Sequence, residues 1–145
     1  SDTEAAYIRL AFEMANRAFG EMRGRATRAD VLRSQIMQYI EAHLSDPDLG
    51  PGRIARAHFI SLRYLHALFR NEGITVAGVI RRRRLERCYA SLVDPSSDPR
   101  SIASIASDHG LIDAAQFSRL FRRHFGVTPS SLRAAAGGRP HALAS

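Results

Sequence analysis

One pattern of residues occurs twice in this chain and constrains its fold more than any other feature. The first copy is Ile54-Ala55, Ser61, Leu65 and Phe69, and the second is Ile105-Ala106, Asp113, Phe117 and Phe121. The Ile-Ala pairs are 51 positions apart, and the other matched residues are 52 positions apart. Ser and Asp are favoured directly before the first turn of a helix. Each copy therefore predicts a short helix, a tight turn and a capped second helix, which is the layout of a helix-turn-helix.

The rest of the chain has helical periodicity interrupted by Gly and Pro, and alternating strand patterns are nearly absent. We therefore predict an all-α fold of two tandem, homeodomain-like helix-turn-helix subdomains joined by a long linker helix. The expected parts are an N-terminal amphipathic helix and linker (1–28), a first helix-turn-helix subdomain (29–74), the linker helix (75–93), a second helix-turn-helix subdomain (94–136) and a flexible tail (137–145). The second helices of the two motifs are expected at 61–71, with Gly73 just beyond, and at 114–125, closed by Gly126.

The N-terminal helix carries an apolar stripe at helical spacing, formed by Ile8, Ala11, Phe12, Ala15, Phe19 and Met22. Such a stripe needs a partner surface. The helix is expected to be the end of an upstream domain, or to pack on this domain or on a second copy. The chain also begins without Met, as a piece of a longer protein would. We expect a homodimer formed through this helix or through a missing upstream domain.

Positive charge is concentrated in the second part of the chain. Residues 1–50 contain six Arg and eight acidic residues, whereas residues 51–145 contain 15 Arg and six acidic residues. The expected partner of so basic a surface is a polyanion, because neutralising phosphates releases their counterions. No segment has the roughly 18 unbroken apolar residues of a membrane span, and no signal peptide is visible. We expect no membrane association and a cytoplasmic, nucleoid-associated protein.

Enzyme and metal chemistry have little support in the sequence. The histidines are scattered, no Cys/His spacing fits a zinc site, and no catalytic or phosphate-cradling motif occurs. We therefore expect no metal, no cofactor and no catalytic residue. Cys88, the single cysteine, is expected to be a small core residue.

The geometry of a helix predicts which side of each second helix faces outward. At about 100° per residue, Leu62, Leu65, Leu68 and Phe69 fall on one side, and Arg63, His66, Ala67 and Arg70 on the other. In the second motif, Ala114, Phe117, Leu120 and Phe121 face inward, whereas Ala115, Ser118, Arg119 and Arg122 face outward. Small residues allow close approach to DNA bases, and Arg can bind guanine O6 and N7 with two hydrogen bonds.

These residues resemble the DNA-binding domain of the AraC/XylS family of transcription regulators. The resemblance runs from about Ile36 to Arg133, roughly two-thirds of the chain. It is closest in the stretches Ile60–Phe69, Arg84–Arg87 and Phe117–Pro129. It implies a seven-helix domain with two recognition helices in successive major grooves of double-stranded DNA, about 34 Å apart. It also implies that the protein is a transcription activator with RNA polymerase as a partner.

The resemblance assigns base-reading positions to Leu62, Arg63, His66 and Ala67, and to Ala114, Ala115, Ser118 and Arg119. Arg70, Arg122 and Arg123 are expected to bind phosphate, and Ser61, although primarily a cap, is a further phosphate donor. The run Arg81–Arg84 cannot share one helix face. Some of its members are expected to be solvated or paired with Glu86, and Arg84 to be structural.

Two positions depart from the family pattern. Phe59 stands where the family commonly has Gly, which predicts either a wider first turn or a phenyl ring in the core. Leu111-Ile112 stands where the family usually has Phe and a polar residue, and this puts the packing of the second turn in question.

Two other functions are compatible with the sequence. A protein-interaction module would dock its basic face on an acidic protein, such as a polymerase subunit. A DNA-repair alkyl transferase carrying this domain as an appendage would need a reactive Cys88 thiolate. Sequence-specific binding at moderate salt distinguishes the DNA reader from the first alternative, and thiol reactivity tests the second.

Overall fold

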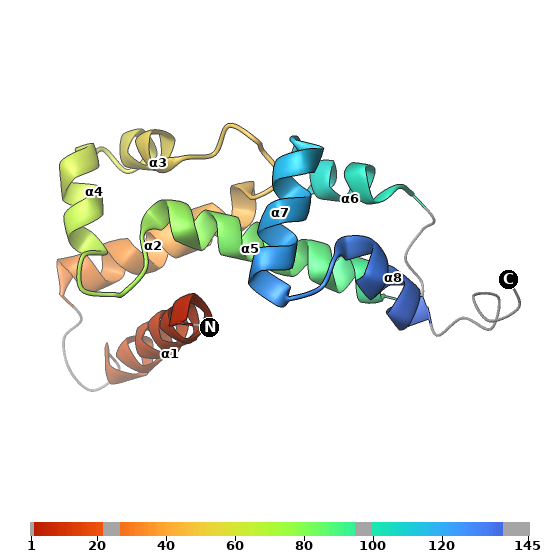
Figure 1. Cartoon of the computed structure of the whole chain (residues 1–145). Coiled ribbons are helices and arrows are strands. Elements are labelled where there is room, and N and C mark those ends of the chain that lie inside the picture. Colours follow the sequence, from red (N-terminus) through yellow and green to blue (C-terminus); the bar gives the residue numbers. More distant parts are fainter. Residues whose placement is uncertain (1, 22–26, 95–99, 138–145) are drawn as a thin grey trace, which may run out of the picture. The chain divides into compact units, whose positions relative to one another are not determined.

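The computed structural model describes residues 2–21, 27–94 and 100–137, and over these ranges it contains eight α-helices and no strand (Figure 1). The helices are α1 (Asp2–Glu21), α2 (Arg28–His43), α3 (Pro51–Ala57), α4 (Leu62–Leu68), α5 (Val76–Val93), α6 (Ile102–Asp108), α7 (Ala114–Phe125) and α8 (Pro129–Gly137). The prediction of an all-α fold is confirmed. None of the described helices is long and apolar enough to cross a membrane.

The chain divides within α5, between Arg82 and Arg83, into two compact units. The first contains α1 to α4 and the N-terminal part of α5. The second contains the rest of α5 and α6 to α8, together with Ser45–Pro47. Each unit has a helix-turn-helix of its own, and α5 is one continuous helix of 18 residues.

The first unit is built around aliphatic side chains from all five of its helices. Its fully buried members include Leu10, Ile36, Ile40, Ile54, Leu65 and Val76. Leu65, an anchor of the sequence repeat, lies on α4 and Ile54 on α3. The apolar positions shared by the two copies of the repeat are therefore the ones that pack α3 against α4.

The second unit has an aromatic ring at one repeat position where the first has an aliphatic group, because Phe117 corresponds to Leu65 while Phe121 corresponds to Phe69. Phe117 and Phe121 are almost completely buried with Ile105 and Leu85, and the rings of Phe121 and Phe125 lie 4.7 Å apart. Cys88 is fully buried in this core, as predicted. Leu111 packs against the same core, whereas Ile112 is 69% exposed. The departure from the family pattern is thus accommodated with Leu111 inside and Ile112 outside.

The polar residues expected to begin helices do so by accepting hydrogen bonds from free backbone N–H groups. Ser61 Oγ accepts from Tyr64 N at 3.0 Å and Asp113 Oδ1 from Gln116 N at 3.0 Å. Thr75 Oγ1 accepts from Gly78 N in the same way. Each such cap stabilises its helix by about 1 kcal/mol. These caps are set by local sequence, which is why the sequence predicted them.

The second helix of the first motif is shorter than predicted. α4 ends at Leu68, and the residues up to Gly73 form turns, whereas the sequence suggested a helix to Asn71. Phe69 N and Arg70 N donate to the carbonyls three residues earlier, which tightens the end of the helix. The Leu68 carbonyl instead accepts a hydrogen bond from Arg33 Nη1 of α2 at 3.1 Å. A long-range partner thus replaces the next helical turn.

The buried face of α1 differs from the stripe seen in the sequence. Ala6 and Leu10 pack into the first unit, whereas Ile8 and Phe12 are 59% and 66% exposed. Ala11 and Ala15 are exposed as well. The side chain of Phe19, Met22, most of the predicted linker and the tail beyond Gly137 lie outside the described residues. Periodicity identified an amphipathic helix, but the face that packs on this unit is a different one.

Candidate nucleic-acid interface

The two helix-turn-helix turns have the same backbone hydrogen bonds. Ile60 N donates to Ala55 O at 3.0 Å, and Leu111 N donates to Ala106 O at 2.9 Å. These pairs are 51 residues apart, like the Ile-Ala pairs of the sequence. One extra residue, Ile112, then precedes the Asp113 cap. The change from a 51-residue to a 52-residue offset is therefore located at Ile112.

Phe59 begins the first turn in the left-handed conformation, with φ of 57°, and its side chain is 95% exposed. Gly110 takes the same place in the second turn, with φ of 87°. Both expectations for Phe59 are therefore wrong. The turn keeps the hydrogen bond of its glycine-containing counterpart and is not wider, and the ring does not fill the core.

On α4, the structure exposes most of the residues to which the resemblance assigned base reading. Arg63 and His66 are exposed, Leu62 is 46% exposed, and Ala67 is half-buried. The helical wheel had placed Leu62 on the inward side. At the first position of α4, directly after the cap, it lies largely outside the core formed by Leu65 and Leu68. Arg70 is exposed in the turn after α4.

On α7, all four of the assigned residues, Ala114, Ala115, Ser118 and Arg119, are exposed. Ala114 was predicted to face inward, but it too is the first residue of its helix. Arg122 and Arg123 are exposed near the helix end, where Gly126 closes α7 with φ of 78°. The residues to which the resemblance assigned base reading thus lie on corresponding outer faces of α4 and α7, each within its own unit.

Exposed polar residues that the sequence interpretation left out also lie on these helices. Tyr64 is 44% exposed on α4, and Gln116 is exposed at the matching position of α7. The 52-residue offset relates these two residues and was available as a signal. Gln116 supplies an amide that can bind adenine N6 and N7, on a helix whose first two residues are alanines.

Several arginines elsewhere in the described residues pair with acidic side chains, whereas the arginines on these faces do not. Among the described residues, Arg63, Arg70, Arg119, Arg122 and Arg123 form no ion pair. Elsewhere Arg33 pairs with Asp30, and Arg100 pairs with Asp108. Acidic side chains therefore neutralise arginines that support the fold, and the charge on α4 and α7 stays uncompensated.

The run Arg81–Arg84 is distributed around α5, as the sequence indicated. Arg81 is exposed, Arg83 Nη1 donates to Glu86 Oε1 at 2.6 Å, and Arg84 is 8% exposed. Arg84 Nη2 donates to the Asp46 carbonyl at 2.6 Å. Burial lowers the pKa of Arg84, while Asp46 acts in the opposite direction. Both the Glu86 pairing and the structural role of Arg84 are confirmed.

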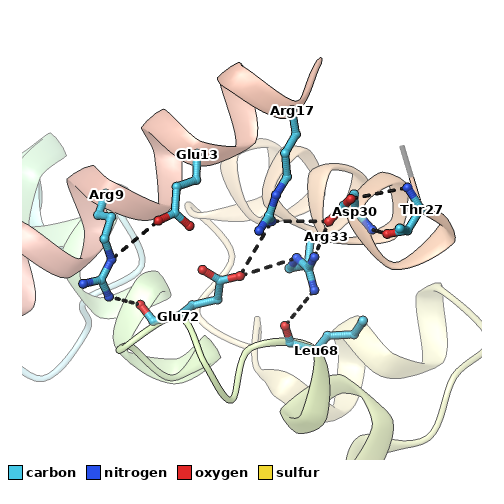
Figure 2. Close-up of polar contacts among 8 residues, drawn as sticks. All are labelled: Arg9, Glu13, Arg17, Thr27, Asp30, Arg33, Leu68 and Glu72. Carbon is cyan, nitrogen blue, oxygen red and sulfur yellow. Dashed lines mark hydrogen bonds and ion pairs between the residues drawn. The ribbon is translucent and has the colours of Figure 1, made fainter. Parts of the chain in front are cut away.

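A polar network connects α1 and α2 to the turn that follows α4 (Figure 2). The buried Glu72 carboxylate lies 3.8 Å from Arg17 Nη1 and 3.7 Å from Arg33 Nε. Arg9 Nη2 of α1 donates to the Glu72 carbonyl at 2.9 Å. Figure 2 shows Arg33 between this carboxylate and the Leu68 carbonyl at the end of α4. The position of α4 therefore depends on α1 and α2.

The charge of Asp30 is maintained in the same network. Burial acts to raise the pKa of Asp30, but hydrogen bonds from the Thr27 side chain and backbone, with Arg17 and Arg33, lower it overall. Thr27 and Asp30 form a reciprocal cap at the start of α2. This carboxylate thus joins the helix cap to the arginine cluster.

Nothing in the described residues forms a metal or nucleophile site. The described ranges hold no group of three His, Cys, Asp or Glu residues that could bind a metal ion. Burial raises the pKa of the Cys88 thiol to about 12, which removes the thiolate that alkyl transfer would need.

Residues 54–135 match the family model described as a helix-turn-helix domain. The XylDLEGF operon transcriptional activator of Pseudomonas putida is 37% identical over 97 residues, which are 66% of this chain and 30% of the relative. The regulatory protein SoxS of Salmonella typhimurium is 34% identical over 99 residues, 68% of this chain and 89% of SoxS. The chain belongs to the AraC/XylS family. This is a family of DNA-binding transcription regulators and not of enzymes.

Solved structures of AraC-type domains have the same fold. The C-terminal domain of the response regulator AraT from Geobacillus stearothermophilus has a TM-score of 0.67 at 26% identity, covering 75% of this chain and 88% of that one. An AraC-type regulator from Chromobacterium violaceum has a TM-score of 0.63 at 28% identity, covering 74% and 92%. The tandem helix-turn-helix fold is therefore confirmed. The chain spans about 30% of the length of the first two XylDLEGF activators that it matches.

Proposed function

We propose that this AraC/XylS-family chain activates transcription by binding a specific double-stranded DNA site with α4 and α7 in successive major grooves. The observation that carries the proposal is the pair of exposed, unpaired arginine faces at corresponding positions of the two motifs. On α7 the neighbouring exposed residues Ala114, Ala115 and Ser118 are small, so the helix backbone can come close to base edges. The names of several relatives as transcriptional activators support the direction of regulation.

The residues divide into base readers and phosphate binders. Arg63 and Arg119 are proposed to bind guanine in their respective grooves, and the other readers are Leu62, His66, Ala67, Ala114, Ala115 and Ser118. Gln116 is added on α7, because its exposed amide fits adenine. Arg70, Arg122 and Arg123 are proposed to bind phosphates, and the Ser61 hydroxyl keeps a proton to donate while it accepts from Tyr64 N.

Selection of bound sequences from a random DNA pool tests this function. Wild-type protein is expected to select two short elements about one helical turn apart. Arg63→Ala should relax only the element bound by α4, and Arg119→Ala only the element bound by α7. Arg28→Ala, an exposed arginine at the start of α2, is the control and should select the wild-type sequence.

A selection that stays random, with affinity that falls steeply with salt, would contradict sequence reading by this chain. Capture of an acidic protein in place of DNA would instead favour the interaction module.

A positive selection leads to the next step, which is transcription in vitro from a promoter carrying the selected site. Stimulation of RNA polymerase there is the expected result. A cytoplasmic, nucleoid-associated protein is the localisation that this function would require.

The outer face of α1 is proposed to mediate homodimerisation. Ile8 and Phe12 are largely exposed on this face, while Ala6 and Leu10 hold the other face on the first unit. Ile8→Glu with Phe12→Glu should shift sedimentation from dimer to monomer. Val31→Glu, at another exposed apolar residue, is the control. A monomeric wild type would rule out a dimer through α1 in this chain.

A further inference from the structure

Phe59 has a backbone conformation that its residue type does not favour. Among the described residues it is the one non-glycine residue with positive φ, at 57°. In this region the β-carbon of an L-residue crowds the following carbonyl oxygen, and bulky side chains are rare there. Gly110, at the equivalent point of the second motif, forms the same turn without a β-carbon. The turn itself therefore does not require Phe at position 59.

The fold gains no packing in return for this strain. The Phe59 side chain is 95% exposed, the highest exposure among the large apolar residues described. An aromatic ring that is both strained and solvated does not stabilise its own unit. Residues held in unfavourable backbone conformations are concentrated at sites that bind or react, so an observed outlier of this kind suggests a function.

The neighbours of Phe59 identify what the ring would contact. Two residues later, Ser61 caps α4, and on that helix Leu62 and Tyr64 are 46% and 44% exposed beside the unpaired Arg63. In a helix-turn-helix the second helix enters the major groove, with its first residues at the base edges. The turn before α4 is thus next to the bases. In the second unit, Ile112 directly precedes the cap of α7 and is 69% exposed.

We propose that Phe59 is a specificity-determining residue that packs its ring against a thymine methyl group at the edge of the site bound by α4. The inference rests on the proposed function, because it needs α4 in the major groove. The C5-methyl of thymine is the apolar group that the major groove offers, and it distinguishes thymine from the other bases. Burying it against an exposed phenyl ring removes apolar surface from water on both sides.

A double-mutant cycle, with one change in the protein and one in the DNA, tests this contact. Binding is measured for wild type and Phe59→Gly, on the selected site and on copies with deoxyuridine replacing thymine at one position each. Wild type should lose roughly three- to tenfold in affinity at one position, which corresponds to the loss of one buried methyl group. Phe59→Gly should bind the unmodified site more weakly by a similar factor. Deoxyuridine at that same position should cause no further loss of affinity in this variant.

Stability provides the second readout, since a destabilised variant could bind weakly for trivial reasons. Phe59→Gly removes the strained β-carbon, so we expect its melting temperature to stay level or to rise by about 2–4 °C. Weaker DNA binding by an equally or more stable protein is the combination that the proposal requires. Val31→Ser, which removes an exposed apolar side chain from α2, is the control and should keep full deoxyuridine sensitivity.

Three results would overturn the proposal. Unchanged affinity of Phe59→Gly for the selected site would mean that the ring does not contact DNA. Equal weakening on every sequence would indicate contact with the sugar-phosphate backbone instead of a methyl group. Normal DNA binding with lost transcription would assign the ring to a protein partner. In all three cases wild type still selects its site, whereas failure of the proposed function itself would leave no selected site.

Discussion

At the scale of single residues, burial separates two uses of arginine in this protein. Arg84 is almost inaccessible and donates to the Asp46 carbonyl, whereas Arg63 and Arg119 are exposed without an acidic partner. A buried guanidinium needs hydrogen bonds to offset its lost hydration. An exposed one stays available for bidentate contact with guanine or phosphate. Burial also shifts the pKa values of two titratable groups in the second unit, Cys88 and His109.

The Cys88 thiol is expected to be unreactive in the native protein. Its side chain is fully buried, and burial raises its pKa to about 12, so the thiolate is scarce at neutral pH. A thiol reagent added to native protein should modify Cys88 only as fast as the second unit opens, and immediately in denaturant. Fast modification of native protein would show that this core is open to solvent.

His109 is expected to make the second unit sensitive to acid. Burial is the main cause that lowers the pKa of His109, and Arg87 and Arg100 lower it further. The unfolded state, with a pKa near 6.5, then binds more protons than the native state, so stability falls as pH drops below about 6.5. Denaturant unfolding at a series of pH values measures this loss.

The variant His109→Gln should remove that part of the pH dependence. Gln can keep a hydrogen bond to Ser91 Oγ, which lies 3.1 Å from His109 Nε2. His66→Gln, at an exposed residue of α4, is the control and should retain the wild-type profile. An unchanged profile in His109→Gln would assign the acid sensitivity to other groups.

At the scale of elements, α4 is too short to hold its position alone. It has seven residues, and its last carbonyl and the turn beyond it are bound by Arg33 from α2 and Arg9 from α1. Glu72 neutralises Arg17 and Arg33 where the three helices meet (Figure 2). Because isolated helices of this length are unstable in water, tertiary contacts determine where its outer face lies.

Glu72→Gln is expected to destabilise the first unit by about 2 kcal/mol, since it removes the buried carboxylate beside Arg17 and Arg33 and leaves Asp30 as their acidic partner. Glu13→Gln is the control, because Glu13 forms an exposed pair with Arg9 worth at most about 0.5 kcal/mol. Denaturant unfolding measures both, and DNA selection should show that Glu72→Gln weakens the α4 element before the α7 element. Equal stability of the two variants would contradict a positioning role for Glu72.

At the scale of the whole molecule, two cores on one continuous α5 repeat the same motif with different packing, with Leu65 in the first unit replaced by Phe117 in the second. The chain carries a net charge of +7, and its basic excess lies in residues 51–145, which include both motifs. Binding to DNA should therefore have a large sequence-independent component that weakens as salt rises.

The salt dependence of affinity distinguishes phosphate binders from base readers. Arg122→Ala should reduce the slope of log K against log salt by about 1 and weaken all sequences alike. Arg119→Ala should relax base preference at one position. Arg28→Ala again serves as the control. If Arg122→Ala lost base preference at one base pair, Arg122 would be a base reader and not a phosphate binder.

The sequence by itself determined the helices, the caps of α4 and α7, and the two motifs. These depend on contacts a few residues apart, and the repeat showed the same contacts twice. It also predicted a structural role for Arg84 and a pairing of the Arg81–Arg84 run with Glu86, because helix geometry separates consecutive side chains. Only the tertiary structure decided that α4 stops at Leu68, that α1 buries Ala6 and Leu10, and that Phe59 is solvated. Those outcomes depend on partners distant in sequence, such as Arg33 for Leu68, and on which side chains the rest of the unit covers.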